Sequence, residues 1–204
     1  IFIVFQAEEG IRDLGRSRGL GYVYKIQCHD IRMIFQNSNE SLNPGLTLGT
    51  ILEEPLRLST KLNAQQRSAL IEQTLRQVGL MAEHRFFYRH MLSDGQRQRI
   101  ALARALILNP KVIVADEPFA ALDPSVRSQA VNLLMKLQRD LGLGFIFISH
   151  NLGIVRHISD KVIIMKEGKV VESGKTDAIF NWPKDDYTKK LVESHQALVN
   201  RQHN

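Results

Sequence analysis

Apolar residues recur at helical spacing in the middle of the chain. Between residues 100 and 107 they fall on one face of a predicted helix, and the arginines of the same segment fall on the other face. Ser93 is a favoured N-cap residue, and Gln96, three residues later, completes the pattern of a capping box. The sequence therefore predicts a helix that begins after Ser93 and stops before Asn109-Pro110, because a residue that precedes proline avoids the helical conformation.

Three short apolar runs predict strands, and each leads into a polar side chain that can take part in chemistry. The runs and the residues that follow them are 31–35 with Gln36, 112–115 with Asp116 and Glu117, and 145–148 with His150. A short apolar run of this kind is typical of a buried parallel strand. Open α/β sheets bind ligands at the carboxyl ends of their strands, so the acidic pair is expected at such an end.

Other helices are marked by their ends. Asn63 predicts the N-cap of a second helix, and Gly79 predicts its end. Asp123 followed by Pro124 predicts the start of a third helix, with proline in the first helical position, and Gly142 ends it. Both glycines suit the left-handed backbone conformation that often terminates a helix.

Two further segments carry weaker signals. Residues 47–58 are expected to form one helix that is broken or bent at Pro55. Residues 162–172 are predicted to form a β-hairpin that turns at Glu167-Gly168.

Composition and charge restrict the possible classes of protein but do not indicate a function. The chain has 204 residues, 44% hydrophobic and 24% charged, which is enough for one domain with a proper core. Its net charge is +6, but the basic residues are scattered, which does not favour nucleic acid as a partner. The single cysteine, Cys28, excludes an internal disulfide and fits a reducing compartment. No run approaches the about 18 apolar residues that span a membrane.

Five short motifs follow one another in a fixed order. They are Gln36, the segment Leu92–Gln96, the pair Asp116-Glu117, residues 120–123, and His150. In this order they resemble the Q-loop, signature, Walker B, D-loop and switch histidine of the nucleotide-binding subunits of ABC transporters. The resemblance covers about residues 27–191. It implies an α/β fold of the ABC-type P-loop NTPase class, with a mostly parallel sheet flanked by helices and an α-helical subdomain, incomplete at the N-terminus.

The resemblance also divides the chain. Residues 27–46 and 92–176 correspond to a RecA-like ATPase core, and residues 47–91 to the helical subdomain. Residues 177–204 correspond to the C-terminal tail of peptide importers, and residues 1–26 are an atypical N-terminal segment in which the family's phosphate loop is missing.

For catalysis, the resemblance implies ATP and Mg²⁺ as cofactors and gives four residues roles around one nucleotide. Asp116 would hold Mg²⁺ through water, and Gln36 would complete the shell of the metal. Glu117 would be the general base that polarises the attacking water, and His150 would bond the γ-phosphate.

A second set of residues would serve a partner subunit, because the family ATPase is a head-to-tail dimer. Ser93, Gly95 and Gln96 would contact the nucleotide of the partner, and Asp123 would couple the two sites. Asp94 stands where the family more commonly has glycine, and its carboxylate would repel a nearby γ-phosphate.

The phosphate-binding loop of the family has only a poor counterpart. Residues 10–17 approximate G-x-x-x-x-G-K-[ST], but Arg16 replaces the lysine and Asp13 would put negative charge inside the loop. We therefore expect the chain to bind ATP poorly by itself, and we hypothesise that it donates Leu92–Gln96 to the complete site of a partner. A truncated or frame-disrupted gene product with foreign first residues is the explanation that we favour.

Some residues indicate a branch of the family. Ser41-Leu42-Asn43-Pro44 and the tail from Trp182 to Leu191 resemble the importers of oligopeptides and dipeptides. Residues 32–36, 54–58 and 90–93 resemble most closely the ATPase subunits for antimicrobial-peptide uptake, and a dipeptide or oligopeptide importer is the alternative. A non-catalytic subunit that donates only its signature is the alternative from another class.

The partners implied by this resemblance are a second ATPase subunit, identical or different, and two transmembrane permease subunits. A periplasmic peptide-binding protein would take part indirectly, and no nucleic acid is expected. The chain would lie at the cytoplasmic face of the inner membrane, as a peripheral subunit. Residues 86–89 are a candidate contact patch for the permease, although packing inside the helical subdomain accounts equally well for Phe86 and Phe87.

Overall fold

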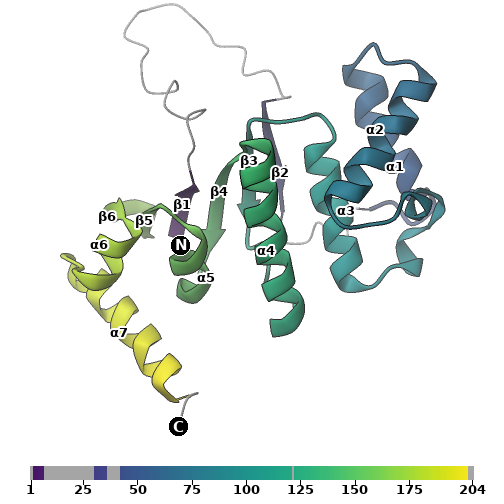
Figure 1. The fold of residues 1–204 in the computed structure, drawn as a ribbon. Helices are drawn as coiled ribbons and strands as arrows, with labels where there is room; N and C mark the ends of the chain where they lie inside the picture. The colour runs from purple at the N-terminus through teal and green to yellow at the C-terminus, as the bar shows by residue number, and fades with distance from the viewer. Residues whose placement is uncertain (1, 7–29, 36–41, 121, 202–204) are drawn as a thin grey trace, which may run out of the picture.

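The computed structural model describes residues 2–6, 30–35, 42–120 and 122–201. Its centre is a six-stranded sheet with the strand order β2-β3-β4-β1-β5-β6 (Figure 1). In chain order, the strands are β1 (Phe2–Gln6), β2 (Ile31–Ile34), β3 (Val112–Asp116), β4 (Gly144–Ser149), β5 (Lys161–Lys166) and β6 (Lys169–Lys175). The strands and the hairpin predicted from the apolar runs are therefore present.

Four of the six strands run in the same direction. β2, β3 and β4 pair in parallel, whereas β1 pairs antiparallel with both β4 and β5, and β6 pairs antiparallel with β5. β4 and β5 thus point the same way, and only β1 and β6 are reversed. This agrees with the expected mostly parallel sheet, with the start of the chain inserted as a reversed strand between β4 and β5.

Four helices, α1 to α4, begin and end close to the predicted positions, and the described residues contain three more. The helices are α1 (Leu48–Ser59), α2 (Ala64–Gln77), α3 (Asp94–Leu106), α4 (Pro124–Leu141), α5 (Leu152–Ile158), α6 (Thr176–Asn181) and α7 (Asp186–Arg201), with two 3₁₀ turns, η2 (Ala82–Phe86) and η3 (Arg89–Met91). Asn63 and Gln66 form a capping box at α2. Gly79 and Gly142 follow α2 and α4 with φ of 74° and 63°, so both have the left-handed conformation expected of them.

One helix, α3, links the sheet to a separate group of helices. α3 contacts β2 and α4, and it also contacts α1 and α2. In Figure 1, α1 and α2 stand at the right of the view, α4 lies in front of β3 and β4, and α5 to α7 gather at the lower left.

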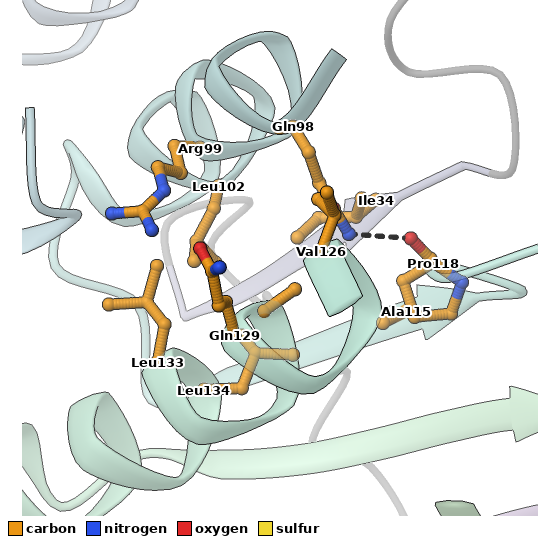
Figure 2. A pocket seen from close by; sticks show the side chains of 12 residues that line it. Ile34, Gln98, Arg99, Leu102, Ala115, Pro118, Val126, Gln129, Leu133 and Leu134 are labelled. Carbon is orange, nitrogen blue, oxygen red and sulfur yellow. Dashed lines mark hydrogen bonds between the residues drawn. The ribbon is translucent and has the colours of Figure 1, made fainter. Parts of the chain in front are cut away.

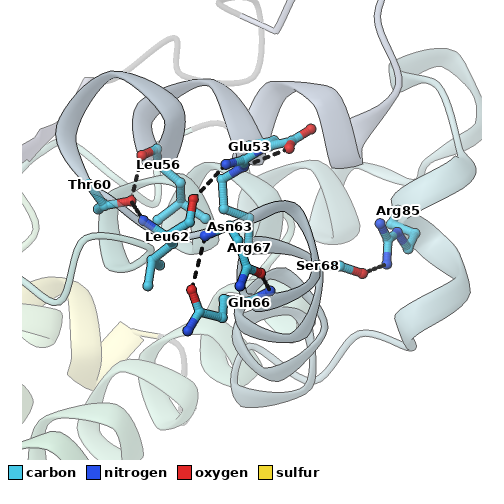
Figure 3. A network of polar contacts seen from close by, with 9 residues as sticks. All are labelled: Glu53, Leu56, Thr60, Leu62, Asn63, Gln66, Arg67, Ser68 and Arg85. Atoms are coloured by element: carbon cyan, nitrogen blue, oxygen red, sulfur yellow. Dashed lines mark hydrogen bonds and ion pairs between the residues drawn. The ribbon is translucent and has the colours of Figure 1, made fainter.

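Polar contacts hold the turn between α1 and α2 (Figure 3). Arg67 donates from Nε to Glu53 at 2.8 Å and from Nη1 to the carbonyl oxygen of Leu62 at 2.6 Å. Thr60 donates its hydroxyl to the carbonyl oxygen of Leu56 at 2.6 Å. One arginine therefore ties the second helix both to the first helix and to the loop that connects them.

The expected break at Pro55 does not occur, because α1 is one helix from Leu48 to Ser59. Proline removes one backbone donor, which costs stability in a helix interior. Leu48, Leu52 and Leu56 are fully buried along one face of the same helix. The burial of this apolar face offsets the lost hydrogen bond, which helix propensity alone does not reveal.

The core of the sheet centres on β4. Phe145 and Phe147 are both buried, and their rings stack with centroids 5.3 Å apart. Phe119, which follows β3, stacks on Phe147 with centroids 6.3 Å apart. These contacts fix the end of β3 against β4.

The C-terminal helix is attached to the sheet through one carboxylate. Glu172 in β6 accepts hydrogen bonds from the backbone N–H groups of Lys184 at 3.0 Å and Asp185 at 3.1 Å, just before α7. Burial raises the pKa of Glu172, but the two N–H groups, the Thr188 side chain and the charge of Lys184 together outweigh it, so the pKa lies below its ordinary value of 4.5.

The E172Q variant is expected to unfold more easily by about 1 kcal/mol at neutral pH, because it loses charge-assisted hydrogen bonds at a partly exposed site. A lowered pKa in the folded state means that the carboxylate stabilises the fold above its unfolded pKa. This contribution is lost as the pH falls through the folded-state pKa, below 4.5. Urea denaturation of both proteins from neutral to acidic pH measures the difference, which should shrink with acid. The matched control is E167Q, at the exposed turn of the same hairpin, and an equal loss in both variants would contradict the assignment.

Candidate functional site

The candidate site lies where two parallel strands end. In the register of β3 with β4, Asp116 is opposite Ile148. The chain then leaves β3 with Glu117, whose backbone N–H donates to the carbonyl oxygen of Ile148 at 2.9 Å. The residues that follow β3 and β4 therefore meet at the same edge of the sheet.

Glu117 and His150 are in direct contact at this edge. One carboxylate oxygen of Glu117, Oε1, accepts from the backbone N–H of His150 at 2.8 Å and lies 2.6 Å from His150 Nδ1. The other, Oε2, lies 3.5 Å from the hydroxyl of Ser149. Only 19% of the Glu117 side chain is exposed, against 78% of the His150 side chain. A largely sheltered carboxylate is thus in contact with an exposed imidazole that a ligand can reach.

The backbone of Glu117 is itself unusual. Its φ is 44°, in the left-handed region that residues other than glycine rarely occupy. Such a conformation costs on the order of 1 kcal/mol and persists where surrounding contacts enforce it. Here the enforcing contacts are the hydrogen bonds to Ile148 and His150.

The predicted cap of α3 is present in full. The Gln96 backbone N–H donates to Ser93 Oγ at 3.3 Å, and the Ser93 backbone N–H donates to Gln96 Oε1 at 3.0 Å. Asp94 is exposed and forms an ion pair with Arg97 one turn along the helix. The N-terminus of α3 is thus capped, and its acidic residue is paired within the helix.

Gly95 has a packing reason to be glycine. A Cβ atom at this position would lie 3.1 Å from a methyl carbon of Val126 in α4. A side chain at this position would require Val126 to shift by a few tenths of an ångström, so glycine gives α3 its close approach to α4 without such a shift.

The structure describes two of the three other expected site residues, Asp116 and Asp123. Asp116 is at the tip of β3, beside Glu117. Asp123 is the N-cap residue of α4, as predicted, but its side chain makes no capping hydrogen bond. Gln36 lies outside the described residues, as do residues 10–17 and Cys28.

The expected site residues form two sets of hydrogen bonds, one at Glu117 and His150 and one at Ser93 and Gln96. Within the described residues, no hydrogen bond joins Ser93 or Gln96 to Glu117 or His150. The acidic strand tip and the capped helix start are two distinct features of one chain.

Sequence reasoning missed a residue that connects these features. Gln98 in α3 donates from Nε2 to the carbonyl oxygen of Pro118 at 2.6 Å, directly after Glu117 (Figure 2). Its other amide atom, Oε1, is buried without a partner. The two residues are 20 positions apart, so no local pattern could have predicted the contact.

The same glutamine lies beside a small apolar cavity between α3, α4 and the sheet. The cavity is about 50 Å³ and is lined mainly by aliphatic side chains, among them Ile34, Leu102 and Leu134. Figure 2 shows the Gln98 side chain beside Ile34 and Val126, with its amide directed toward the carbonyl oxygen of Pro118.

The chemistry of the strand tip suits a magnesium–phosphate ligand. Mg²⁺ is usually bound through one or two carboxylates together with substrate phosphates and water. Asp116 and Glu117 supply carboxylates at the edge where α/β sheets take ligands. Among the described residues there is no group of three or more His, Cys, Asp or Glu side chains that could hold a metal alone.

A solved structure shares this architecture. It is described as cbiO1 from Clostridium perfringens, part of the ABC transporter complex cbiONQ. The TM-score is 0.68 at 27% sequence identity, over 86% of this chain and 68% of the other. The fold is therefore that of the ABC-type P-loop NTPases.

Sequence comparison gives the family. A family model described as ABC transporter matches residues 10–120, which is more than half of the chain. The chain belongs to the ABC transporter family. The match begins at residue 10, inside the segment 1–26 that is atypical in sequence.

Curated relatives are similar over most of this chain. The dipeptide transport ATP-binding protein DppF of Haemophilus influenzae is 51% identical over 82% of this chain and 51% of its own length. Two SapF proteins are each 47% identical to this chain, over 84% of this chain and 64% of their own length. SapF of Escherichia coli K12 is named a putrescine export system ATP-binding protein. SapF of E. coli O6:H1 strain CFT073 is named a peptide transport system ATP-binding protein. The chain thus spans about half to two thirds of the length of these relatives.

The Q98M variant tests the contact between α3 and the loop after Glu117. It removes the donor to Pro118 while filling a similar volume, and we expect a loss of about 1 kcal/mol in unfolding free energy. We also expect faster amide exchange at Ala120, whose N–H donates to the carbonyl oxygen of Glu117 at 3.2 Å. Denaturation and hydrogen exchange measure the two effects. Q129M alters a glutamine beside the same cavity and serves as control; equal behaviour of both variants would argue against the role of Gln98.

Proposed function

We propose that this chain is the ATP-binding and ATP-hydrolysing part of an ABC transporter for peptides. The observation that carries the proposal is the contact between Glu117 and His150 beside Asp116, at the ligand-binding edge of the sheet. The printed names of the DppF and SapF relatives support the transport of peptides.

At the chain's own site, ATP with Mg²⁺ is the cofactor, and the metal supplies charge neutralisation for phosphoryl transfer. Asp116 and Gln36 would hold the metal. Glu117 accepts the proton of the attacking water, since its carboxylate is largely sheltered from solvent. Oε2 is the oxygen that does not bond His150. His150 bonds the γ-phosphate through its exposed imidazole, which the carboxylate of Glu117 orients.

At the second site, this chain serves the nucleotide of another ATPase subunit, identical or different. Ser93, Gly95 and Gln96 present the start of α3, where unpaired N–H groups and the helix dipole favour an anion. Asp123 couples the two sites through the start of α4. The ion pair with Arg97 reduces the repulsion that Asp94 would exert on a phosphate.

The division of the chain supports this assignment of roles. We propose that residues 27–46 and 92–176 form the ATPase core, residues 47–91 the helical subdomain and residues 177–204 the C-terminal tail. The contacts of α3 with both β2 and α2 support this division, with α3 as the helix that joins the proposed core to the proposed subdomain.

Two permease subunits are the proposed membrane partners, with a periplasmic peptide-binding protein acting through them. Phe86 and Tyr88 are exposed at the surface before η3, which supports a contact patch at residues 86–89. Phe87 instead packs beside His84, with ring centroids 4.9 Å apart. No helix among the described residues has the length and apolar character needed to cross a membrane. We propose a peripheral position at the cytoplasmic face of the inner membrane.

Antimicrobial peptides are the proposed substrate class, with dipeptides or oligopeptides as the alternative. The relatives carry printed names for dipeptide transport, peptide transport and putrescine export. The resemblance of residues 32–36, 54–58 and 90–93 to antimicrobial-peptide systems favours the first class.

A complementation assay tests whether Leu92–Gln96 serves a partner. The chain is mixed with an intact peptide-importer ATPase subunit whose own signature serine is replaced by alanine. We expect this chain to restore ATP hydrolysis at least tenfold, because electrostatic contacts in the transition state are worth several kcal/mol. The S93A variant should fail to restore it, while S128A, an exposed serine of α4, should act like the unchanged chain.

Nucleotide titration of the chain alone accompanies this assay. Weak binding to the isolated chain together with restored hydrolysis supports the donor role. Micromolar affinity of the isolated chain for ATP would instead indicate a complete site of its own. No restoration by any variant would contradict the donor role.

A further inference from the structure

His84 is a buried histidine that none of the roles above uses. It lies in η2, its residue is only 4% exposed, and its ring packs beside Phe87. Nδ1 faces the backbone of Met81, with the nitrogen at 3.1 Å and the carbonyl oxygen at 3.2 Å. A histidine in such a place must satisfy both ring nitrogens inside the protein.

The other ring nitrogen faces the last residue of the signature. His84 Nε2 is 3.3 Å from Nε2 of Gln96. The opposite end of the same amide, Oε1, accepts the backbone N–H of Ser93 at 3.0 Å. One side-chain amide therefore bridges the buried histidine and the cap of α3.

The direction of the Gln96 amide fixes the tautomer that fits. With its oxygen on the Ser93 N–H, Gln96 presents N–H groups to His84, so His84 Nε2 must be an acceptor. His84 then carries its hydrogen on Nδ1 and donates it to the carbonyl oxygen of Met81. In this tautomer the Met81 backbone N–H, which lies 3.1 Å from Nδ1, loses that nitrogen as an acceptor.

The alternative tautomer conflicts with the cap. If Nδ1 accepted the Met81 N–H, the hydrogen would be on Nε2 and would face the N–H groups of Gln96. The amide would have to turn its oxygen to His84, and the Ser93 N–H would lose its acceptor. The state of His84 and the closure of the cap are therefore linked.

We propose that His84 is a positioning residue for the signature segment. Its Nε2 accepts from the Gln96 side chain and holds the amide in the orientation that closes the cap on Ser93. The effect on a partner's nucleotide rests on the proposed function, whereas the link between His84 and Gln96 does not.

The tautomer is measured directly on the unchanged 204-residue chain. Long-range ¹H–¹⁵N correlation spectra of the labelled imidazoles distinguish a hydrogen on Nδ1 from one on Nε2. We expect His84 as the Nδ1–H form, with Nε2 in the range of an acceptor nitrogen. A hydrogen on Nε2 would overturn the proposal, and this measurement needs no variant to fold.

Variants then test the consequence for the cap. H84F removes the acceptor and should speed hydrogen exchange of the Ser93 amide by about fivefold to tenfold, the effect of one lost hydrogen bond. H84Q retains an acceptor oxygen near the position of Nε2 and should recover most of the protection. H90F, at an exposed histidine that stacks on Tyr88, is the matched control. Equal exchange in H84F and H90F would refute the role.

The complementation assay supplies the functional readout. H84F should lower the restored hydrolysis, chiefly by raising the KM for ATP, and H84Q should recover it. If H84F restores hydrolysis as well as the unchanged chain, the positioning role is wrong. If the unchanged chain restores none, the proposed function fails, and the tautomer and exchange data still decide the link between His84 and Gln96.

Discussion

The parallel register of β3 and β4 is the constraint on which the candidate site depends. It sets Asp116 opposite Ile148, so that Glu117 and His150 leave the sheet at the same edge and meet. A slip by one residue would turn the side chains of a strand to the opposite face and separate this pair. The aromatic packing in β4 resists such a slip, and the geometry of the site is in this sense a property of the core.

The helix α3 connects the strand ends at this edge to the other helices. Close to its start, Gly95 allows near contact with α4, and Gln98 bonds the loop that follows Glu117. From the same helix, Arg99 donates to the carbonyl oxygens of Val78 and Gly79, at the end of α2. α3 therefore contacts α1 and α2 on one side and, through Gln98, the loop beside the acidic pair on the other.

The features that the sequence predicted are those set by neighbouring residues. The capping box at Ser93, the N-cap at Asn63 and the helix ends at Gly79 and Gly142 depend on residues within a few positions, and all are present. What the sequence could not predict depends on distant contacts: the reversed pairing of β1, the continuity of α1 through Pro55, and the bond from Gln98 to Pro118. The proposed roles of the site residues came from the order of the motifs, since no single motif defines one.

The geometry of the α3 cap determines which donors remain for an anion. Ser93 Oγ accepts the N–H of Gln96, and the carbonyl oxygen of Ser93 accepts that of Arg97. A hydroxyl that accepts through its lone pairs still has its own hydrogen to donate. The Ser93 hydroxyl hydrogen and the N–H groups of the first turn are donors of the kind that a phosphate oxygen accepts. Capping and anion binding are thus compatible uses of one serine, provided that the amide of Gln96 keeps its orientation.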